Sequence, residues 1–385
     1  MQQKERAIQP ACRQTSDLFR GQPESSRRAA LGACGLPPIP VKPSTMSHRK
    51  PRSTLSGRVT LSEIAARVGT SAITVSRVLN TPHLVSEELR TQIESAIEEL
   101  GYMPNRAARA LASARSDSVA VLIPSLSNTV FTRLLEGVRD VLHGAGYRAL
   151  IGDTRYSNDE EENLLRAYLE HAPDGILITG ADQTPATRRL LERSRIPVVH
   201  MMEVSESAPY CVGLRQFDAG RTLTEHLLER GYRRIGFLGA QLDPRVLERL
   251  AGYRAALQQA GLPFAAGEIL DPTPSSIGLG GTLLDRLLRQ APDCDAIFCC
   301  NDDLAHGVLF ECQRRGIRVP EQLAVAGFND LAASAWICPT LTTIATPRYE
   351  IGHAAASMLL QLMKGESPEP AQENLGFTLV VREST

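Results

Sequence analysis

The sequence predicts an all-α helix-turn-helix headpiece joined to an α/β core with two lobes of parallel, doubly wound sheet. Between residues 58 and 103, three short amphipathic helices surround tight turns, which is typical of a helix-turn-helix. Between residues 116 and 385, short apolar strands alternate with amphipathic helices, as in parallel sheets covered on both faces. Eight such strands in about 270 residues exceed one sheet, so we expect two lobes with a cleft at the carboxyl ends of their strands.

The distribution of charge indicates where this chain meets its partners. The 385 residues include 42 basic and 43 acidic side chains, for a formal net charge of −1. By segment, residues 1–45 carry +4, residues 46–115 carry +4 and residues 116–385 carry −9. A basic end on an acidic body indicates contact with nucleic acid at that end only.

Composition excludes several classes of protein. No apolar run reaches the ~18 residues of a membrane helix, and the first residues hold no signal-peptide core, so we expect a cytoplasmic protein. The eight cysteines include no C-x-x-C pair, and Cys299 and Cys300 lie in an apolar run where buried reduced thiols are expected. Because the histidines are scattered singly, we expect neither a metal site nor a cofactor.

Residues 1–57 are expected to form a disordered basic arm, because they are rich in Gln, Ser, Arg and Pro and lack any apolar period. Met46 opens a second basic stretch and is a possible true start of the chain. The intact mass of the native protein would distinguish the two starts.

In the headpiece, residues 58–103, the helix boundaries follow from capping signals. Thr60 and Glu63 have the spacing of a capping box, and Gly69 is suited to end the first helix. Ser71 can cap the second helix and Ser86 the third, which closes a three-helix core.

Residues 104–115 are expected to form a short hinge helix. Pro104 breaks the preceding element, and Asn105 can cap the strong helix formers that follow it. Two turns of helix are marginal in water, so this segment should be ordered only when something holds it.

Several of these segments resemble the LacI/GalR family of repressors. Residues 59–80 are similar to the family's DNA-binding headpiece, and residues 101–112 to its hinge helix. AIFCCNDDLAHG, VAGFND and PTLTTI resemble its sugar-binding core, which implies a periplasmic-binding-protein-like (type I) fold for residues 116–385. LGAQLDPR, FECQRRGI and GFTLV are similar to the gluconate-utilisation branch of the family, so a repressor released from DNA by a sugar acid is expected.

The second helix is the one expected in the major groove of DNA. Arg77 can bind guanine through two hydrogen bonds, while Ala72 and Ile73, placed by the resemblance, can make only apolar contacts with bases. Thr60 and Ser71 are candidates for phosphate contacts, with simple helix capping as the alternative. Thr74 and Ser76 also project from the outer face of this helix. Together with Asn80, they are further candidates for phosphate contacts.

The resemblance gives the hinge a role in DNA binding. It places Leu111 as a wedge inserted into the minor groove, with Ala108 and Asn105 beside it; burial of Leu111 in a protein core is the alternative. A palindromic double-stranded operator demands a two-fold protein, so a homodimer is expected.

The resemblance also places an effector site in the cleft. Arg249 matches the arginine that holds the ligand in the family, and Asn301 and Asp302 match ligand-facing positions. Asn329 and Met202 stand where relatives often have acids, and two missing carboxylates favour an anionic ligand over a neutral sugar. Further candidates are Ser125 and Ser127 on the first strand-helix loop, Phe131 at the start of the helix that follows, and His200 and Arg215 at strand ends. The alternatives are core packing for Phe131 and His200 and a salt bridge on the lobe surface for Arg215.

Two other classes were weighed against a regulator. An enzyme is disfavoured because the sequence contains neither a P-loop nor G-x-S-x-G, and the headpiece argues against a transport-binding protein. Within the regulators, an activator, or an effector such as 2-ketogluconate, 6-phosphogluconate or a neutral sugar, remains open.

Overall fold

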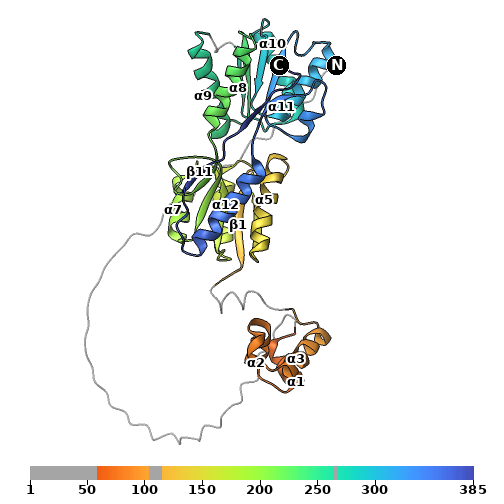
Figure 1. Cartoon of the computed structure of the whole chain (residues 1–385), viewed down its shortest axis with the longest axis vertical. Helices are drawn as coiled ribbons and strands as arrows, with labels where there is room; N and C mark the ends of the chain where they lie inside the picture. Colours follow the sequence, from red (N-terminus) through yellow and green to blue (C-terminus); the bar gives the residue numbers. More distant parts are fainter. Residues whose placement is uncertain (1–58, 104–114, 263–266) are drawn as a thin grey trace, which may run out of the picture. The chain divides into compact units, whose positions relative to one another are not determined.

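The computed structural model describes residues 59–103, 115–262 and 267–385 (Figure 1). The described residues fall into two compact units, with the division between Tyr102 and Met103. The predicted arm, residues 1–57, and most of the predicted hinge, including Asn105, Ala108 and Leu111, lie outside the described residues.

The first unit is a three-helix headpiece consisting of α1 (Leu61–Val68), α2 (Ala72–Asn80), the short 3-10 helix η1 (Pro82–Leu84) and α3 (Glu87–Leu100). The predicted capping box is present, because the Glu63 amide donates to the Thr60 hydroxyl at 3.3 Å and the Thr60 amide donates to the Glu63 carboxylate at 2.7 Å. Ser86, by contrast, makes no capping hydrogen bond to α3, contrary to our expectation. Ile64, Val75 and Ile93, one from each α-helix, form the centre of the core.

The second unit contains two six-stranded sheets, as the strand-helix alternation predicted, and Figure 1 shows them as two lobes. The sheet of the first lobe has the order β11-β5-β4-β3-β1-β2, and all its pairs are parallel. Its strands are β1 (Ser118–Ile123), β2 (Arg148–Asp153), β3 (Gly175–Thr179), β4 (Val198–Glu203), β5 (Cys211–Leu214) and β11 (Gln372–Asn374). The helices of this lobe are α5 (Val130–Gly144), α6 (Asn158–Leu169), α7 (Pro185–Ser194) and α12 (Arg348–Met363).

The sheet of the second lobe has the order β12-β10-β9-β8-β6-β7, and only the β10–β12 pair is antiparallel. Its strands are β6 (Ile235–Ala240), β7 (Glu268–Asp271), β8 (Ala296–Cys299), β9 (Ala324–Asn329), β10 (Thr342–Ala345) and β12 (Thr378–Val380). Its helices are α8 (Gln216–Glu229), α9 (Pro244–Gln259), α10 (Ile277–Gln290), α11 (Asp302–Arg315) and the 3-10 helix η3 (Ala332–Ala335).

The chain passes between the lobes three times. It leaves the first sheet after β5 and enters α8, leaves the second sheet after β10 and enters α12, and passes from β11 to β12 near the carboxyl end. The first crossover brings Gln216, at the start of α8, beside the cleft, so the connection between the lobes also supplies part of the site.

Pairs of glycines bring neighbouring helices into backbone contact. Gly220 on α8 faces α9, and a Cβ atom added to Gly252 on α9 would overlap the carbonyl oxygen of Phe217. Gly137 on α5 and Gly352 on α12 are related in the same way, and Gly280 and Gly307 join α10 to α11. Because protein interiors are close-packed, each pair fixes how near its two helices lie.

Within the described ranges, no helix combines the length and the apolar character that crossing a bilayer requires.

Candidate nucleic-acid interface and effector cleft

The exposed face of α2 gathers most of the residues predicted to read DNA. Ile73 is 67% exposed, although it is a large apolar side chain with no partner in the headpiece core. Together with Thr81, the residues Ala72, Ile73, Ser76, Arg77 and Asn80 line a shallow depression of about 330 Å³. An exposed helix face bearing one arginine, small polar side chains and an apolar residue is suited to contact base edges and thymine methyl groups.

Polar residues around α2 fix its start and its end. The Ser71 hydroxyl accepts from the Thr74 amide at 3.1 Å, so the capping role considered for Ser71 is present. At the other end, the Asn80 side-chain amide donates to the Ser76 carbonyl at 2.9 Å. Capping and phosphate contact are compatible for the hydroxyl of Ser71, because it lies on an exposed residue.

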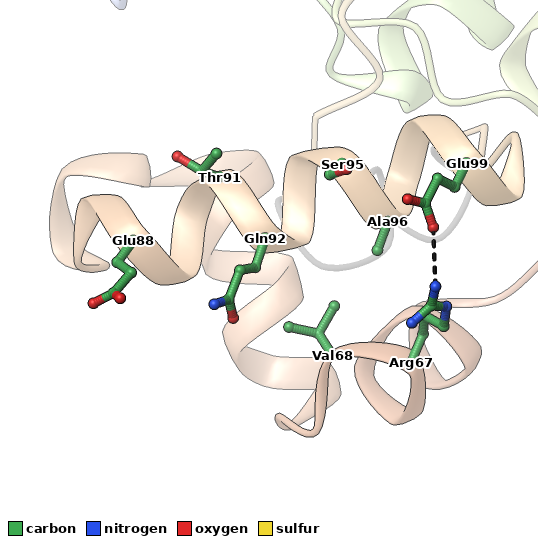
Figure 2. Close-up of a pocket in the computed structure, with 8 residues that line it drawn as sticks. All are labelled: Arg67, Val68, Glu88, Thr91, Gln92, Ser95, Ala96 and Glu99. Atoms are coloured by element: carbon green, nitrogen blue, oxygen red, sulfur yellow. Dashed lines mark hydrogen bonds and ion pairs between the residues drawn. The ribbon is translucent and has the colours of Figure 1, made fainter.

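A second depression on the headpiece lies between α1 and α3, with a volume of about 700 Å³. Figure 2 shows Arg67 of α1 reaching across to Glu99 of α3, and this ion pair measures 3.2 Å. The lining also includes Glu88, and none of the predicted DNA contacts is part of it. The residues predicted to read DNA thus line a depression other than this one, which contains two glutamates and one arginine.

In the core, Arg249 of α9 is a buried cation whose hydrogen bonds go to neutral partners, although the charge of Asp243 acts to raise its pKa. Its Nε donates to Gln216 Oε1 at 2.8 Å and its Nη1 to the Cys300 carbonyl at 2.7 Å. Its guanidinium carbon lies 3.7 Å from the centre of the Phe328 ring, a cation–π contact. Burial lowers the pKa of Arg249 to about 10, so the side chain stays charged at neutral pH.

Arg245, one turn earlier on α9, has a different set of partners. Its Nε and Nη2 donate to the two carboxylate oxygens of Asp243 at 3.2 and 3.1 Å. Burial acts to lower the pKa of Arg245, but the Asp243 charge and hydrogen bonds outweigh it and raise that pKa. Nη1 of Arg245 is buried and has no hydrogen-bond partner among the described residues.

Residues of the first lobe and of the first crossover complete the surroundings of these arginines. Gln216 donates to the Met202 carbonyl at 3.0 Å, so it connects β4 to Arg249. Burial raises the pKa of Glu203 at the end of β4, and the nearby charge of Arg245 opposes that rise. Burial likewise raises the pKa of Tyr156, which accepts from the Asn128 side chain at 3.2 Å and is influenced by both arginines.

Backbone strain concentrates around this cleft. Tyr156 after β2, Met202 in β4 and Asn329 at the end of β9 have φ values of 55°, 78° and 111°. Gln241 and Leu242, after β6, also have positive φ. Because left-handed backbone costs free energy for residues other than glycine, its recurrence at the carboxyl ends of the strands is typical of a functional site.

The comparisons with known proteins agree with this arrangement. The model of the lacI family of bacterial regulatory proteins matches residues 60–105, and the model of the periplasmic binding protein-like domain matches residues 224–385. The HTH-type transcriptional regulator GntR of Pseudomonas aeruginosa is 50% identical over 342 residues, which cover 89% of this chain and 99% of that protein. The chain belongs to the lacI family. This membership confirms the predicted fold class and the regulator class, since such relatives are transcriptional regulators rather than enzymes.

Solved structures of family members support the same assignment. The transcription regulator GntR from Chromobacterium violaceum is 55% identical, with a TM-score of 0.68 over 69% of this chain and 98% of that one. The lac repressor dimer bound to operator and the anti-inducer ONPF is 25% identical, with a TM-score of 0.75 over 85% of this chain and 99% of that one.

Several residues that the lacI-family resemblance placed in the effector site are committed to internal bonds. Asn301 caps α11 by accepting from the Leu304 amide at 3.1 Å, and its side-chain amide donates to Ser275 at 2.8 Å. Asp302 is fully buried and accepts from Leu331, Ser334 and Thr343. These bonds give its carboxylate a structural role, because they hold η3 and β10 against α11, and a ligand contact by Asp302 stays a prediction.

His200 differs from the prediction that it lies at a strand end, whereas Arg215 directly follows β5 as predicted. His200 lies in the middle of β4, where its Nδ1 is 2.8 Å from the Gly180 carbonyl, and burial lowers its pKa, so it is neutral at pH 7. Arg215 precedes α8 on the exposed side and lines a cavity of about 480 Å³ with Glu203 and Glu248. The positive charge expected from His200 is thus absent, and that of Arg215 lies among carboxylates.

The loop after β1 has internal bonds of its own. The Ser125 hydroxyl accepts from the amides of Ser127 and Asn128, both at 3.2 Å, and is 2.9 Å from the Ser127 hydroxyl. Phe131 is 3% exposed and packs in the main core, which is the alternative that we weighed against stacking under a ligand.

Asn329 keeps an unsatisfied atom: its Oδ1 is buried without a hydrogen-bond partner among the described residues. The sequence missed Asp243, Arg245, Gln216 and Tyr156. The expectation of a cleft poor in carboxylates also needs correction, because Asp243 and Glu203 both lie near Arg245. The missed signal was LGAQLDPR, which places a charged pair directly after β6.

Proposed function

We propose that this regulator represses genes of sugar-acid use and that a gluconate-like acid binds its cleft and releases it from operator DNA. One observation carries the choice of an acid: Arg249 is a buried cation whose hydrogen bonds, within the described residues, go to a neutral amide and a neutral carbonyl. The Asp243 carboxylate raises the pKa of Arg249 but is itself hydrogen-bonded to Arg245, so an anionic ligand would supply the directly bonded partner that this buried charge lacks. The resemblance to the gluconate-utilisation branch of the family indicates that this acid is gluconate or a close relative of it.

Calorimetry of the full chain tests this choice of effector. Gluconate is expected to bind, and glucose and glucitol, which have the hydroxyls without the carboxylate, are expected to bind at least about 30-fold more weakly. Titration with 2-ketogluconate and 6-phosphogluconate separates the acids from one another. Binding of neutral sugars alone would show that the effector is not an acid.

The ligand acts through the two lobes. We propose that binding favours a closed arrangement of the lobes, which is incompatible with the operator-bound spacing of the two headpieces in a dimer. We propose that the protein acts in the bacterial cytoplasm, because it must meet both its operator DNA and its effector there. A reporter gene under the operator should be silent without gluconate and expressed with it.

Ser71, Thr74 and Ser76 are proposed to contact phosphates around α2, while Arg77, Ala72 and Ile73 contact bases in the major groove. Thr60, the N-cap of α1, and Asn80, at the end of α2, are proposed as further phosphate contacts.

Replacing Leu111 by alanine is expected to weaken operator binding at least about tenfold and to leave gluconate binding unchanged. The reason is that an apolar wedge contributes only when it enters the minor groove. Fluorescence anisotropy with operator DNA measures the first quantity and calorimetry the second. Loss of gluconate binding in this variant would contradict the assignment.

A homodimer is proposed because a two-fold operator requires two headpieces. The second lobe offers a surface for it. Trp336 is 88% exposed and Phe310 is 46% exposed, and the residues beside them, Ser334 and His306, are joined by a 3.0 Å hydrogen bond. Exposed large apolar side chains on adjoining elements are typical of contact surfaces.

Replacing Trp336 by glutamate is therefore expected to shift the protein from dimer to monomer at micromolar concentration. Aromatic residues at the centre of an interface often contribute 2 kcal/mol or more, about 30-fold in the dissociation constant. Sedimentation velocity measures the shift. Leu247→Glu, at a side chain of α9 that is 45% exposed, is the control and should remain dimeric.

A further inference from the structure

Helix α9 carries two buried arginines next to residues that line the cavity of about 480 Å³, and the two differ in how their charge is balanced. Arg245 and Arg249 are four residues apart, so they lie on one face about 6 Å along the axis from each other. Arg245 is paired with Asp243, whereas the hydrogen bonds of Arg249 go to neutral groups. The two ends of the site therefore differ in charge although both contain an arginine.

Asp243 fills the position where an anion would otherwise bind. Its carboxylate accepts from the amides of Arg245 and Val246 at 2.9 and 3.3 Å, which are the first free amides of α9. It also holds Nε and Nη2 of Arg245. Backbone amides at a helix start together with an arginine are the donors that a phosphate group requires, and here a side chain of the protein already uses them.

The first lobe adds negative charge at the same end. Glu203 is close enough to Arg245 for its carboxylate to be stabilised by that charge, and Asp182 lines the same cavity as Glu203. Arg245 nevertheless keeps a donor, because its Nη1 is buried without a partner among the described residues, and the whole side chain is only 9% exposed. This end of the cleft thus offers one hydrogen-bond donor and no net positive charge.

We propose, building on the acid effector proposed above, that α9 fixes the direction in which the effector binds. Arg249 binds the single carboxylate, and Nη1 of Arg245 donates to a hydroxyl oxygen about one helical turn away. Asp243 and Glu203 exclude a second anionic group from that position. The effector is thus a polyhydroxy monocarboxylate, and acids that carry a phosphate or a second carboxylate at the far end bind more weakly.

Calorimetry with three probes on the full chain tests this specificity: gluconate, 6-phosphogluconate and the dicarboxylate glucarate. The wild type is expected to bind gluconate at least about tenfold more tightly than either dianion. Asp243→Ser keeps a hydroxyl to cap α9 and releases the Arg245 side chain. This variant is expected to reduce the preference for gluconate over 6-phosphogluconate at least tenfold. Asp159→Ser, on an exposed residue of α6, removes the same charge elsewhere and should leave the preference unchanged.

Arg245→Gln tests the donor itself. Losing a hydrogen bond from a charged group should weaken gluconate binding about 10- to 100-fold. Thermal unfolding shows whether each variant is folded, and Asp243→Asn is a second capping variant if the serine variant is not. An unchanged preference in a folded Asp243 variant, or unchanged gluconate affinity in Arg245→Gln, would overturn the inference. Failure of the wild type to bind any acid would instead overturn the proposed function.

Discussion

Replacing Arg249 by methionine is expected to abolish the response to gluconate while the protein still binds its operator. Methionine keeps much of the volume over the Phe328 ring but removes the cation and its bonds to Gln216 and Cys300. Truncating one partner of a buried charge interaction costs about 2–5 kcal/mol, which corresponds to at least about 30-fold weaker binding. Calorimetry measures gluconate affinity, and a gel-shift titration measures operator affinity with and without gluconate.

The matched control for this variant is Arg193→Met, which makes the same exchange at an exposed position of α7. It should release DNA at the wild-type gluconate concentration. If Arg249→Met were released from the operator as readily as the wild type, the carboxylate would be bound elsewhere.

Replacing Gly252 by alanine is expected to destabilise the two-lobed unit by about 3 kcal/mol, at the upper end for overpacked cores. The added methyl group would overlap the Phe217 carbonyl of α8, a backbone atom that cannot move by rotating a side chain. Urea denaturation followed by circular dichroism measures the free energy of unfolding. Arg249, on the same helix, should shift as well, so gluconate binding should weaken in parallel.

Gly278→Ala on α10 provides the opposite result with the same substitution. No atom lies within 4 Å of a Cβ added there, so alanine should stabilise the helix by about 0.5–1 kcal/mol. Equal destabilisation by both variants would mean that the α8–α9 contact has no special role.

The strands that carry an apolar run were predictable from the sequence, including the four-residue strands β5 and β8, whereas β7, β10, β11 and β12 were not. β1 and β6 are fully buried, so their residues are continuously apolar. β7, β11 and β12 have only three or four residues and lie at or beside sheet edges, where no periodic pattern can develop. Their pairing depends on contacts with distant parts of the chain.

The candidate site was predictable only in part, for a related reason. Arg249 was found because its neighbourhood resembles the family's sequence pattern, but burial of Arg245 depends on how the two lobes meet. Asp302 shows what the sequence left out: its position after a strand predicted a ligand contact, but not that three donors from η3, its N-terminal flank and β10 bind its carboxylate. Hydrogen-bond partners at long separation are not encoded in local spacing.

The glycine pairs have a mechanical consequence. Both helices that receive the chain after it crosses between lobes, α8 and α12, are clamped to a neighbour by backbone contact, α8 to α9 and α12 to α5. Helices in such contact resist sliding, because a shift would bring a carbonyl oxygen of one helix into a steric clash with a Cα atom of the other. Each lobe should therefore rotate as a rigid body about the segments that connect the lobes. A ligand bound by α9 would then move the whole second lobe with it.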